Sequence, residues 1–180
     1  MTARVAILGL GGVGRALVRQ IAGTGGGVSI VAVADSSAGL ASSSGKAFSN
    51  HDLLDLVSHK EKGGKVADFA GAADTRRTGP DDLVLSLPDV NQNQTIVVAD
   101  CSNSDSSVCA LRLAVARGFR VASANKKPFA DSSFAVFQEL TRWHGSCRFE
   151  RWERARERER EYVDVASRNS EPWQPNCLFV

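Results

Sequence analysis

Alternating apolar and polar segments predict a chain in which buried strands and helices follow one another. Unbroken apolar runs predict four buried strands, at residues 5–8, 28–34, 95–99 and 119–123. Helical spacing of apolar residues predicts a helix directly after the first strand, with a buried face made by Val13, Ala16, Leu17 and Ile21. Glycines between residues 23 and 27 should end this helix, so the first two strands and the helix form a βαβ unit.

Two further helices are predicted where capping residues precede apolar positions. Residues 50–52 (Asn, His, Asp) can cap a short helix through residues 53–57. Residues 105–107 (Asp, Ser, Ser) can cap a second helix with Val108, Leu111 and Val115 on one face, and Gly118 should end it. This second helix joins the third strand to the fourth, so another strand–helix–strand unit results.

Two segments carry weaker patterns. Residues 36–44 are rich in Ser, Gly and Ala, which favours a loop close to a bound ligand. Residues 66–93 alternate small residues, charges and prolines around one apolar stretch at 83–87. We expect this second segment to be a connector.

A glycine-rich motif lies between the first strand and its helix. The sequence Gly9-Leu10-Gly11-Gly12-Val13-Gly14 has the G-x-G-x-x-G spacing of dinucleotide-binding loops. In such loops the first glycine permits a tight turn, the second lets the backbone approach a pyrophosphate, and the third allows the helix to pack closely on the strand. Gly9, Gly11, Gly12, Val13 and Gly14 are therefore candidate cofactor-binding residues, whereas the alternative is a plain strand–helix turn.

An acidic residue ends the second predicted strand. Asp35 follows Gly14 by 21 residues, where a carboxylate typically accepts hydrogen bonds from the adenosine ribose hydroxyls. Ser36 and Ser37 follow it with no Arg beside them, which favours NAD over NADP although some acid-bearing sites bind both. With the strand, the helix and the glycines, Asp35 predicts an α/β fold of the Rossmann-like, doubly wound type, with a mostly parallel sheet and helices on both faces.

Composition limits the classes of partner. The chain has 180 residues and 43% hydrophobic content, which suits one packed domain with a tail. A net charge of +2 does not indicate nucleic-acid binding, and no apolar run approaches the ~20 residues of a membrane span, so we expect a cytoplasmic protein. The four cysteines and the histidines at 51 and 59 show no metal-ligand spacing, so we expect no metal site and reduced thiols.

Polar residues follow the third and fourth predicted strands. Asp100, Cys101 and then Ser102, Asn103 and Ser104 come after the third strand, and Lys126 and Lys127 come after the fourth. Ligands of parallel sheets gather at such strand ends. A lysine there can bind cofactor or substrate, and the alternative is a solvated turn before Pro128.

Three motifs in this order resemble the homoserine dehydrogenases. They are G-L-G-G-V-G at 9–14, A-D-C-S-N-S at 99–104 and A-N-K-K at 124–127, and the resemblance covers about residues 3 to 150. In that family the polar residues after Asp-Cys lie beside the nicotinamide ribose, and the Lys directly after Asn lies near the nicotinamide and the substrate. The resemblance therefore implies cofactor-binding roles for Ser102, Asn103, Ser104 and Lys126, and a catalytic role for Lys126.

The resemblance also implies a reaction. The family reduces aspartate 4-semialdehyde to homoserine with NADH or NADPH, on the route to threonine and methionine. Reducing an aldehyde needs a hydride donor against the carbonyl carbon and a cation near the oxygen that becomes an alkoxide. Lys126 could supply that positive charge.

After Glu150 the sequence departs from the family. The family continues into an α/β substrate domain that carries acidic residues and a second, proton-donating Lys, whereas this chain continues Arg151-Trp152-Glu153-Arg154. Residues 148–162 hold six Arg and five Glu, whose charges nearly cancel. We therefore expect an NAD(P)-binding domain at 1–147 and a disordered, charged tail at 148–180, with a binding arm as the alternative for the tail.

Two functional hypotheses follow. The first is an NAD(P)-dependent oxidoreductase of the homoserine dehydrogenase type that is truncated and takes its amino-acid substrate only if the missing half is supplied. The second is a catalytically silent NAD(P)-binding module or an interaction protein. Both leave a homo-oligomer as an open alternative.

Overall fold

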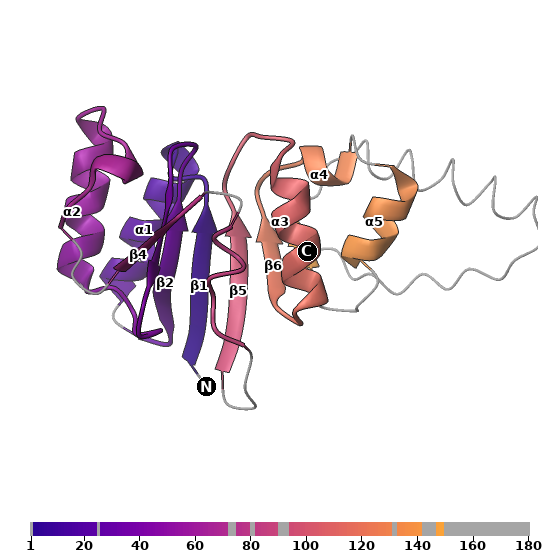
Figure 1. The fold of residues 1–180 in the computed structure, drawn as a ribbon, viewed down its shortest axis with the longest axis horizontal. Coiled ribbons are helices and arrows are strands. Elements are labelled where there is room, and N and C mark those ends of the chain that lie inside the picture. The colour runs from indigo at the N-terminus through magenta and orange to yellow at the C-terminus, as the bar shows by residue number, and fades with distance from the viewer. Residues whose placement is uncertain are drawn as a thin grey trace, which may run out of the picture.

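The computed structural model describes residues 2–24, 26–71, 75–79, 82–89, 94–130, 133–141 and 147–149. They form one sheet of seven strands in the order β4-β3-β2-β1-β5-β6-β7 (Figure 1). The strands are β1 (Thr2–Leu8), β2 (Val28–Ala34), β3 (Gly39–Ser42), β4 (Thr75–Thr78), β5 (Gln94–Asp100), β6 (Arg120–Ser123) and β7 (Cys147–Phe149). The predicted α/β, Rossmann-like fold with a mostly parallel sheet is confirmed.

The parallel part of the sheet reverses its winding direction beside β1. Strands β2 and β5 flank β1 in parallel, so that Ile7 pairs with Val33 on one side and Ala99 on the other. The chain steps from β1 outward to β2 in one direction, and from β5 outward to β6 and β7 in the other. In open α/β sheets, ligands bind at such a switch point, beyond the carboxyl ends of the strands.

Helices cover both faces of the sheet. They are α1 (Gly12–Thr24), α2 (Asn50–Glu61), α3 (Ser107–Ala116), α4 (Lys127–Ala130) and α5 (Phe134–Thr141), with a 3-10 turn η1 (Val66–Asp68) after α2. Alternate residues of β1 enter different cores: Val5 and Ile7 join the core under α1 and α2, whereas Ala6 and Leu8 join the core under α3 and α5. This two-sided burial explains why the central strands read as unbroken apolar runs.

Helix α1 is rotated relative to the predicted face. Leu17 and Ile21 pack on the core as expected, but Val13 and Ala16 are exposed, and the fully covered positions are Gly14 and Val18. Gly14 must face the strand because a Cβ there would lie 2.1 Å from the Gly9 carbonyl oxygen. At about 100° per residue, Val13 and Ala16 then turn away from that side. The prediction was wrong for these two residues.

Two antiparallel strands extend the sheet beyond β2. Strand β3 pairs with β2 and β4 pairs with β3, both antiparallel. The segment 36–44 is therefore not simply a loop, because Leu40 and Ala41 of β3 are buried. A composition rich in small residues indicates a loop. Here the small side chains allow a tight hairpin after Asp35, so that β3 pairs with the edge of β2.

The segment 66–93 also contributes to the core, contrary to its description as a connector. Leu83, Val84 and Leu87 are buried in a turn against the α3 side of the sheet. The Arg117 guanidinium holds this turn, since it donates hydrogen bonds to the carbonyls of Val84 (2.6 Å) and Leu87 (2.8 Å). That clamp comes from a distant helix, so local sequence does not reveal it.

The ends of some elements differ from the prediction by a few residues. The N-cap of α2 is Ser49, whose hydroxyl accepts a hydrogen bond from the Asp52 N–H (3.1 Å), rather than the segment 50–52. Strand β7 includes Arg148 and Phe149, the first two residues of the predicted 148–180 tail, and the rest of that tail lies outside the described residues. No helix among the described residues is long and apolar enough to cross a membrane.

Candidate dinucleotide-binding site

The glycine-rich loop connects β1 to α1 at the carboxyl end of the sheet. Gly9 adopts φ 90°, a conformation that side chains other than glycine rarely take. A Cβ at Gly9 would lie 2.6 Å from the backbone of Ser102, and a Cβ at Gly14 would lie 2.1 Å from the Gly9 carbonyl oxygen. Both glycines are therefore required by close packing, as the motif predicts.

The middle of the same loop is open. A Cβ at Gly11 or Gly12 would meet no atom within 4 Å, and the Val13 side chain is 56% exposed. The Gly11 carbonyl accepts the Arg15 N–H (3.0 Å), so Gly11 stands directly before the first turn of α1. The N–H groups of a first helical turn have no partner within the helix, and they attract anions. Open space beside these N–H groups fits a pyrophosphate.

Asp35 lies in the turn between β2 and β3, and its side chain is only 9% exposed. Its carboxylate accepts hydrogen bonds from the N–H groups of Ser37 (2.8 Å), Ala38 (3.2 Å) and Val66 (3.0 Å). Burial alone would raise the pKa of this carboxyl, but hydrogen bonds from Lys60, Ser37 and Val66 outweigh burial and hold the pKa well below its usual range. Asp35 is therefore a carboxylate at neutral pH.

Lys60 is a neighbour of Asp35 that the sequence did not indicate. Its ammonium donates a hydrogen bond to Asp35 Oδ2 at 2.5 Å, and its side chain is 14% exposed. Lys60 lies in the last turn of α2, 25 residues after Asp35. No cation lies next to Asp35 in the sequence, so local spacing gives no sign of this pair.

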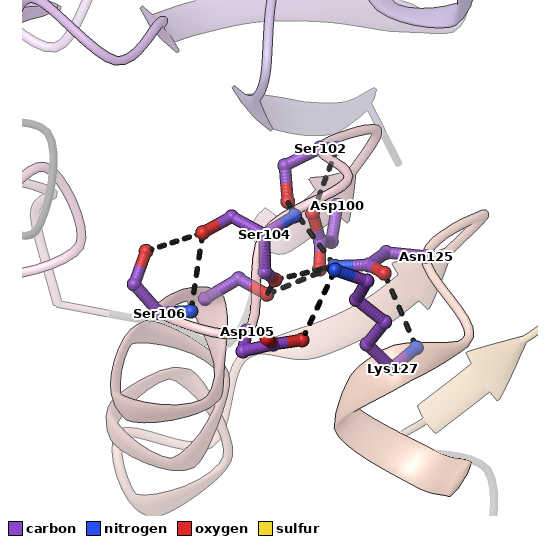
Figure 2. Close-up of polar contacts among 8 residues, drawn as sticks. Asp100, Ser102, Ser104, Asp105, Ser106, Asn125 and Lys127 are labelled. Carbon is purple, nitrogen blue, oxygen red and sulfur yellow. Dashed lines mark hydrogen bonds and ion pairs between the residues drawn. The ribbon is translucent and has the colours of Figure 1, made fainter. Parts of the chain in front are cut away.

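The loop after β5 brings further candidates to the same end of the sheet. Leu8, Asp100 and Ser123 pair in register, so β1, β5 and β6 end at the same level. Ser102 is partly buried against the glycine loop, whereas Asn103 and Ser104 are exposed. The Ser104 hydroxyl lies 2.8 Å from the Ser106 hydroxyl at the start of α3 (Figure 2).

Cys101 precedes this loop and is not a nucleophile. Burial raises the pKa of the Cys101 thiol to about 11, and the negative charge of Asp100 acts in the same direction. Since the thiolate is the reactive form of cysteine, Cys101 remains an inert thiol at neutral pH.

The two lysines after β6 occupy different places. Lys126 is exposed in the loop between β6 and α4. Lys127 begins α4, and its ammonium lies 3.5 Å from Asp105 Oδ1 in the loop before α3 (Figure 2). The structure thus brings Lys126 to the edge of the sheet that also carries Gly9 and Ser102.

His51 and His59 lie near opposite ends of α2. His51 is exposed near the start of α2, where Nδ1 lies 3.3 Å from Asp55. His59 is partly buried against the Phe69 ring, and its Nε2 lies 3.0 Å from the Lys65 carbonyl oxygen. Within the described part of the chain, no three His, Cys, Asp or Glu side chains are grouped as metal ligands.

Asp100 and Asn125 are two residues of this region that the sequence analysis did not single out as site residues. They are 0% and 3% exposed, and they end β5 and follow β6 respectively. Asn125 Nδ2 donates a hydrogen bond to Asp100 Oδ2 at 3.2 Å (Figure 2). Each of them lies between an apolar strand and the exposed polar residues of its motif. This position was the sign in the sequence that could have identified them.

Comparisons with known proteins agree with this geometry. A family model described as the NAD-binding domain of homoserine dehydrogenase matches residues 9–150. A solved hyperthermophilic archaeal homoserine dehydrogenase in complex with NADPH has a TM-score of 0.60 and 24% identity, and the match covers 79% of this chain and 41% of that chain. No curated protein matches the sequence.

Two further solved structures share the fold. One is the homoserine dehydrogenase from Thermoplasma acidophilum (TM-score 0.55, 23% identity), where the match covers 85% of this chain and 43% of that chain. The other is a putative homoserine dehydrogenase from Archaeoglobus fulgidus (TM-score 0.51, 20% identity), with 83% and 41% covered. This chain therefore spans less than half the length of each of these three structures. The predicted cofactor class, NAD or NADP, is confirmed by the matched NAD-binding domain.

Proposed function

Because the chain belongs to the family of homoserine dehydrogenase NAD-binding domains, we propose that it holds a nicotinamide dinucleotide across the carboxyl ends of β1 and β5. The pyrophosphate would lie on the open Gly11–Val13 backbone, and Asp35 would accept hydrogen bonds from the adenosine ribose. Ser102, Asn103 and Ser104 would border the nicotinamide ribose, and Lys126 would lie beside the nicotinamide.

One observation carries this proposal. The backbone of Ser102 lies so close to Gly9 that a Cβ on Gly9 would be 2.6 Å from it. The glycine loop and the polar loop after β5 are therefore adjacent, and a single extended ligand can span both. Two surface loops that do not share a ligand would not need to pack this closely.

The chemistry follows from the ligand and from Lys126. When bound, a reduced nicotinamide supplies a hydride to a carbonyl carbon. The carbonyl oxygen gains negative charge during this transfer, and a nearby ammonium stabilises that charge. We assign this role to Lys126, in the reduction of aspartate 4-semialdehyde to homoserine.

The surroundings of Asp35 bear on the choice between NAD and NADP. A carboxylate repels a 2′-phosphate, which favours NADH. The Lys60 ammonium on Asp35 Oδ2 partly offsets this repulsion, so we expect NADPH to bind more weakly than NADH but measurably.

Replacing Lys60 tests this balance. Lys60→Met should lower the affinity for NADPH about tenfold more than the affinity for NADH, an effect of about 1.4 kcal/mol. Exposed Lys62, directly after α2, gives the matched control Lys62→Met, which should change neither. Equal losses for the two cofactors in Lys60→Met would contradict the assignment. Titration by fluorescence of the reduced cofactor provides the measurement.

The groups that bind the substrate are expected in the part of the family's proteins that this chain does not match. The chain covers 41% of the archaeal enzyme solved with NADPH. In the family that this chain resembles, we expect the acidic substrate residues and the second Lys in the later domain. We therefore propose that this chain supplies the cofactor half of the reaction.

A catalytically silent NAD(P)-binding module is the second candidate, favoured by the same coverage. The full chain is mixed with homoserine and either NAD or NADP, and reduced cofactor is followed by absorbance. Cofactor binding with negligible turnover would support a module that supplies the cofactor half. Turnover at the rate of a complete enzyme would show that this chain holds substrate groups that the proposal places elsewhere.

A further inference from the structure

Buried polar side chains gather in one place among the described residues. Four residues qualify, and all lie where β5 and β6 end and α3 begins: Asp100 (0% exposed), Asn125 (3%), Ser107 (7%) and Ser123 (7%). Burying a polar group is unfavourable unless it is hydrogen-bonded. Such a cluster therefore indicates that hydrogen bonds fix the positions of these chain segments, which apolar packing alone would not do.

The Asn125 side chain is the centre of this cluster (Figure 2). Its Nδ2 lies within hydrogen-bond distance of four acceptors: Asp100 Oδ2 (3.2 Å), Ser102 Oγ (3.2 Å), the Ser104 carbonyl (2.9 Å) and Ser107 Oγ (3.2 Å). Its Oδ1 accepts the Lys127 N–H at 3.2 Å. One amide thus joins the loop after β5 to the first residues of α4.

Only an amide fits these partners. The Asp100 carboxylate and the Ser104 carbonyl accept hydrogen bonds and cannot donate them, so the group facing them must be an N–H donor. The Lys127 N–H donates, so the group facing it must be an acceptor. An aspartate at position 125 would place an acceptor against acceptors, and an alanine would leave them without this donor.

Asn125 also forms hydrogen bonds that fix the backbone directly before Lys126 and the loop after β5. Its own N–H donates to Ser123 Oγ (3.1 Å), and Ser123 Oγ donates back to the Asn125 carbonyl (2.9 Å). This reciprocal pair bends the chain directly before Lys126. On the other loop, Ser102 both accepts from Asn125 and lies against Gly9.

From these contacts we propose that Asn125 is a positioning residue that holds Lys126 and the Ser102–Ser104 loop in place for the nicotinamide half of the cofactor. The inference rests on the proposed function, because it assumes that this loop borders the nicotinamide ribose. The adenosine half is held separately, by the glycine loop and Asp35. The two halves of the ligand therefore report on different parts of the protein.

Two ligands separate these halves experimentally. ADP carries the adenosine and pyrophosphate without the nicotinamide ribose and the nicotinamide, whereas NADH carries all of these groups. Asn125→Asp should weaken NADH binding about tenfold or more, as expected when a buried donor is lost and its acceptors stay unpaired. The same variant should bind ADP within about twofold of the original chain. Calorimetric titration of the full chain measures both affinities.

Two further variants complete the design. Ser107→Ala removes one acceptor of Asn125 and a hydrogen bond to the Ser104 carbonyl, so it should show the same selective loss at smaller size even if Asn125→Asp does not fold. Asn50→Ala removes an exposed amide that donates to the Ala22 carbonyl on the opposite side of the sheet, and it should change neither affinity.

The outcomes distinguish the inference from the proposed function. A loss of NADH affinity with unchanged ADP affinity supports the positioning role. Equal losses for both ligands, or no loss for either, overturn it and leave the proposed function standing. An original chain that binds neither ligand overturns the proposed function, and this inference with it.

Discussion

Gly11 and Gly14 belong to one motif but meet different surroundings. A Cβ at Gly14 would lie 2.1 Å from a backbone oxygen, whereas a Cβ at Gly11 would meet nothing within 4 Å. Gly14→Ala should therefore destabilise the fold by about 3 kcal/mol through overpacking. Gly11→Ala should leave the free energy of unfolding within about 0.5 kcal/mol and weaken NADH binding about tenfold or more.

Urea unfolding and NADH titration of these two variants together check the contrast. The pair controls itself, because each variant adds one methyl group to the same loop. If Gly11→Ala unfolded as readily as Gly14→Ala, the space beside Gly11 would not be open in the folded chain.

The Asp35 carboxyl should make stability depend on pH in acid. Its pKa in the folded chain is lowered below the unfolded value of about 3.9, because hydrogen bonds from Lys60, Ser37 and Val66 outweigh burial. The unfolded chain then binds more protons, so this contribution is complete above about pH 5 and is lost progressively as pH falls from the unfolded pKa through the lower folded pKa. Asp35→Asn should flatten the stability curve between about pH 5 and pH 2.

Urea midpoints measured across this range for both chains provide the check. The Asp35→Asn chain should be less stable at neutral pH and should lose less stability on acidification. Curves that stay parallel at every pH would show that Asp35 is not held by these partners in the folded state.

At the same scale, sequence identified some site residues and missed others for a physical reason. Gly9, Gly14 and Asp35 stand at fixed spacings around one βαβ unit, so a local motif predicts their places. Lys60 and Asn125 act through partners that lie 25 residues away in the chain. Such contacts depend on how the sheet brings distant strand ends together. The spacing of residues within a local motif does not predict this.

Among the elements, α3 shows how one side chain can hold a distant segment. Besides its bonds to the 82–87 turn, Arg117 donates to Asp89 Oδ1 (2.7 Å) and stacks over Phe119, with 4.8 Å between the guanidinium carbon and the ring centroid. It lies at the end of α3 opposite the candidate site. Arg117→Ala should therefore destabilise the fold by about 2 kcal/mol while leaving NADH affinity unchanged.

Arg112 on the same helix gives the matched control. It forms an exposed ion pair with Glu139, which is worth at most about 1 kcal/mol, so Arg112→Ala should change stability little. Thermal unfolding of both variants, followed by titration with NADH, makes the comparison. Equal stability losses in the two variants would contradict the clamp.

Elements with their own periodic pattern were predictable, and those that depend on a partner were not. Strand β2 has the predicted bounds, Val28–Ala34, because its apolar run is buried on both faces. Strands β3 and β4 were missed because each is short and is stabilised by pairing with the strand before it. The burial of Leu83 likewise depends on the Arg117 clamp rather than on a local pattern.

Over the whole molecule, the match to solved homoserine dehydrogenases covers most of this chain but less than half of each solved chain. The match to the archaeal homoserine dehydrogenase solved with NADPH covers 79% of this chain and 41% of that chain. We therefore propose cofactor binding and turnover as separate properties: the described domain would bind the cofactor, and the substrate groups would lie in a part of the family's proteins that this match does not include.

The central claim is that a nicotinamide dinucleotide binds where β1, β5 and β6 end. Calorimetric titration of the full chain with NADH and NADPH, repeated with Gly11→Ala, tests it most directly. We expect saturable binding of one cofactor molecule per chain, which weakens about tenfold or more in the variant. The absence of saturable binding with both cofactors, or unchanged binding in Gly11→Ala, would contradict the claim.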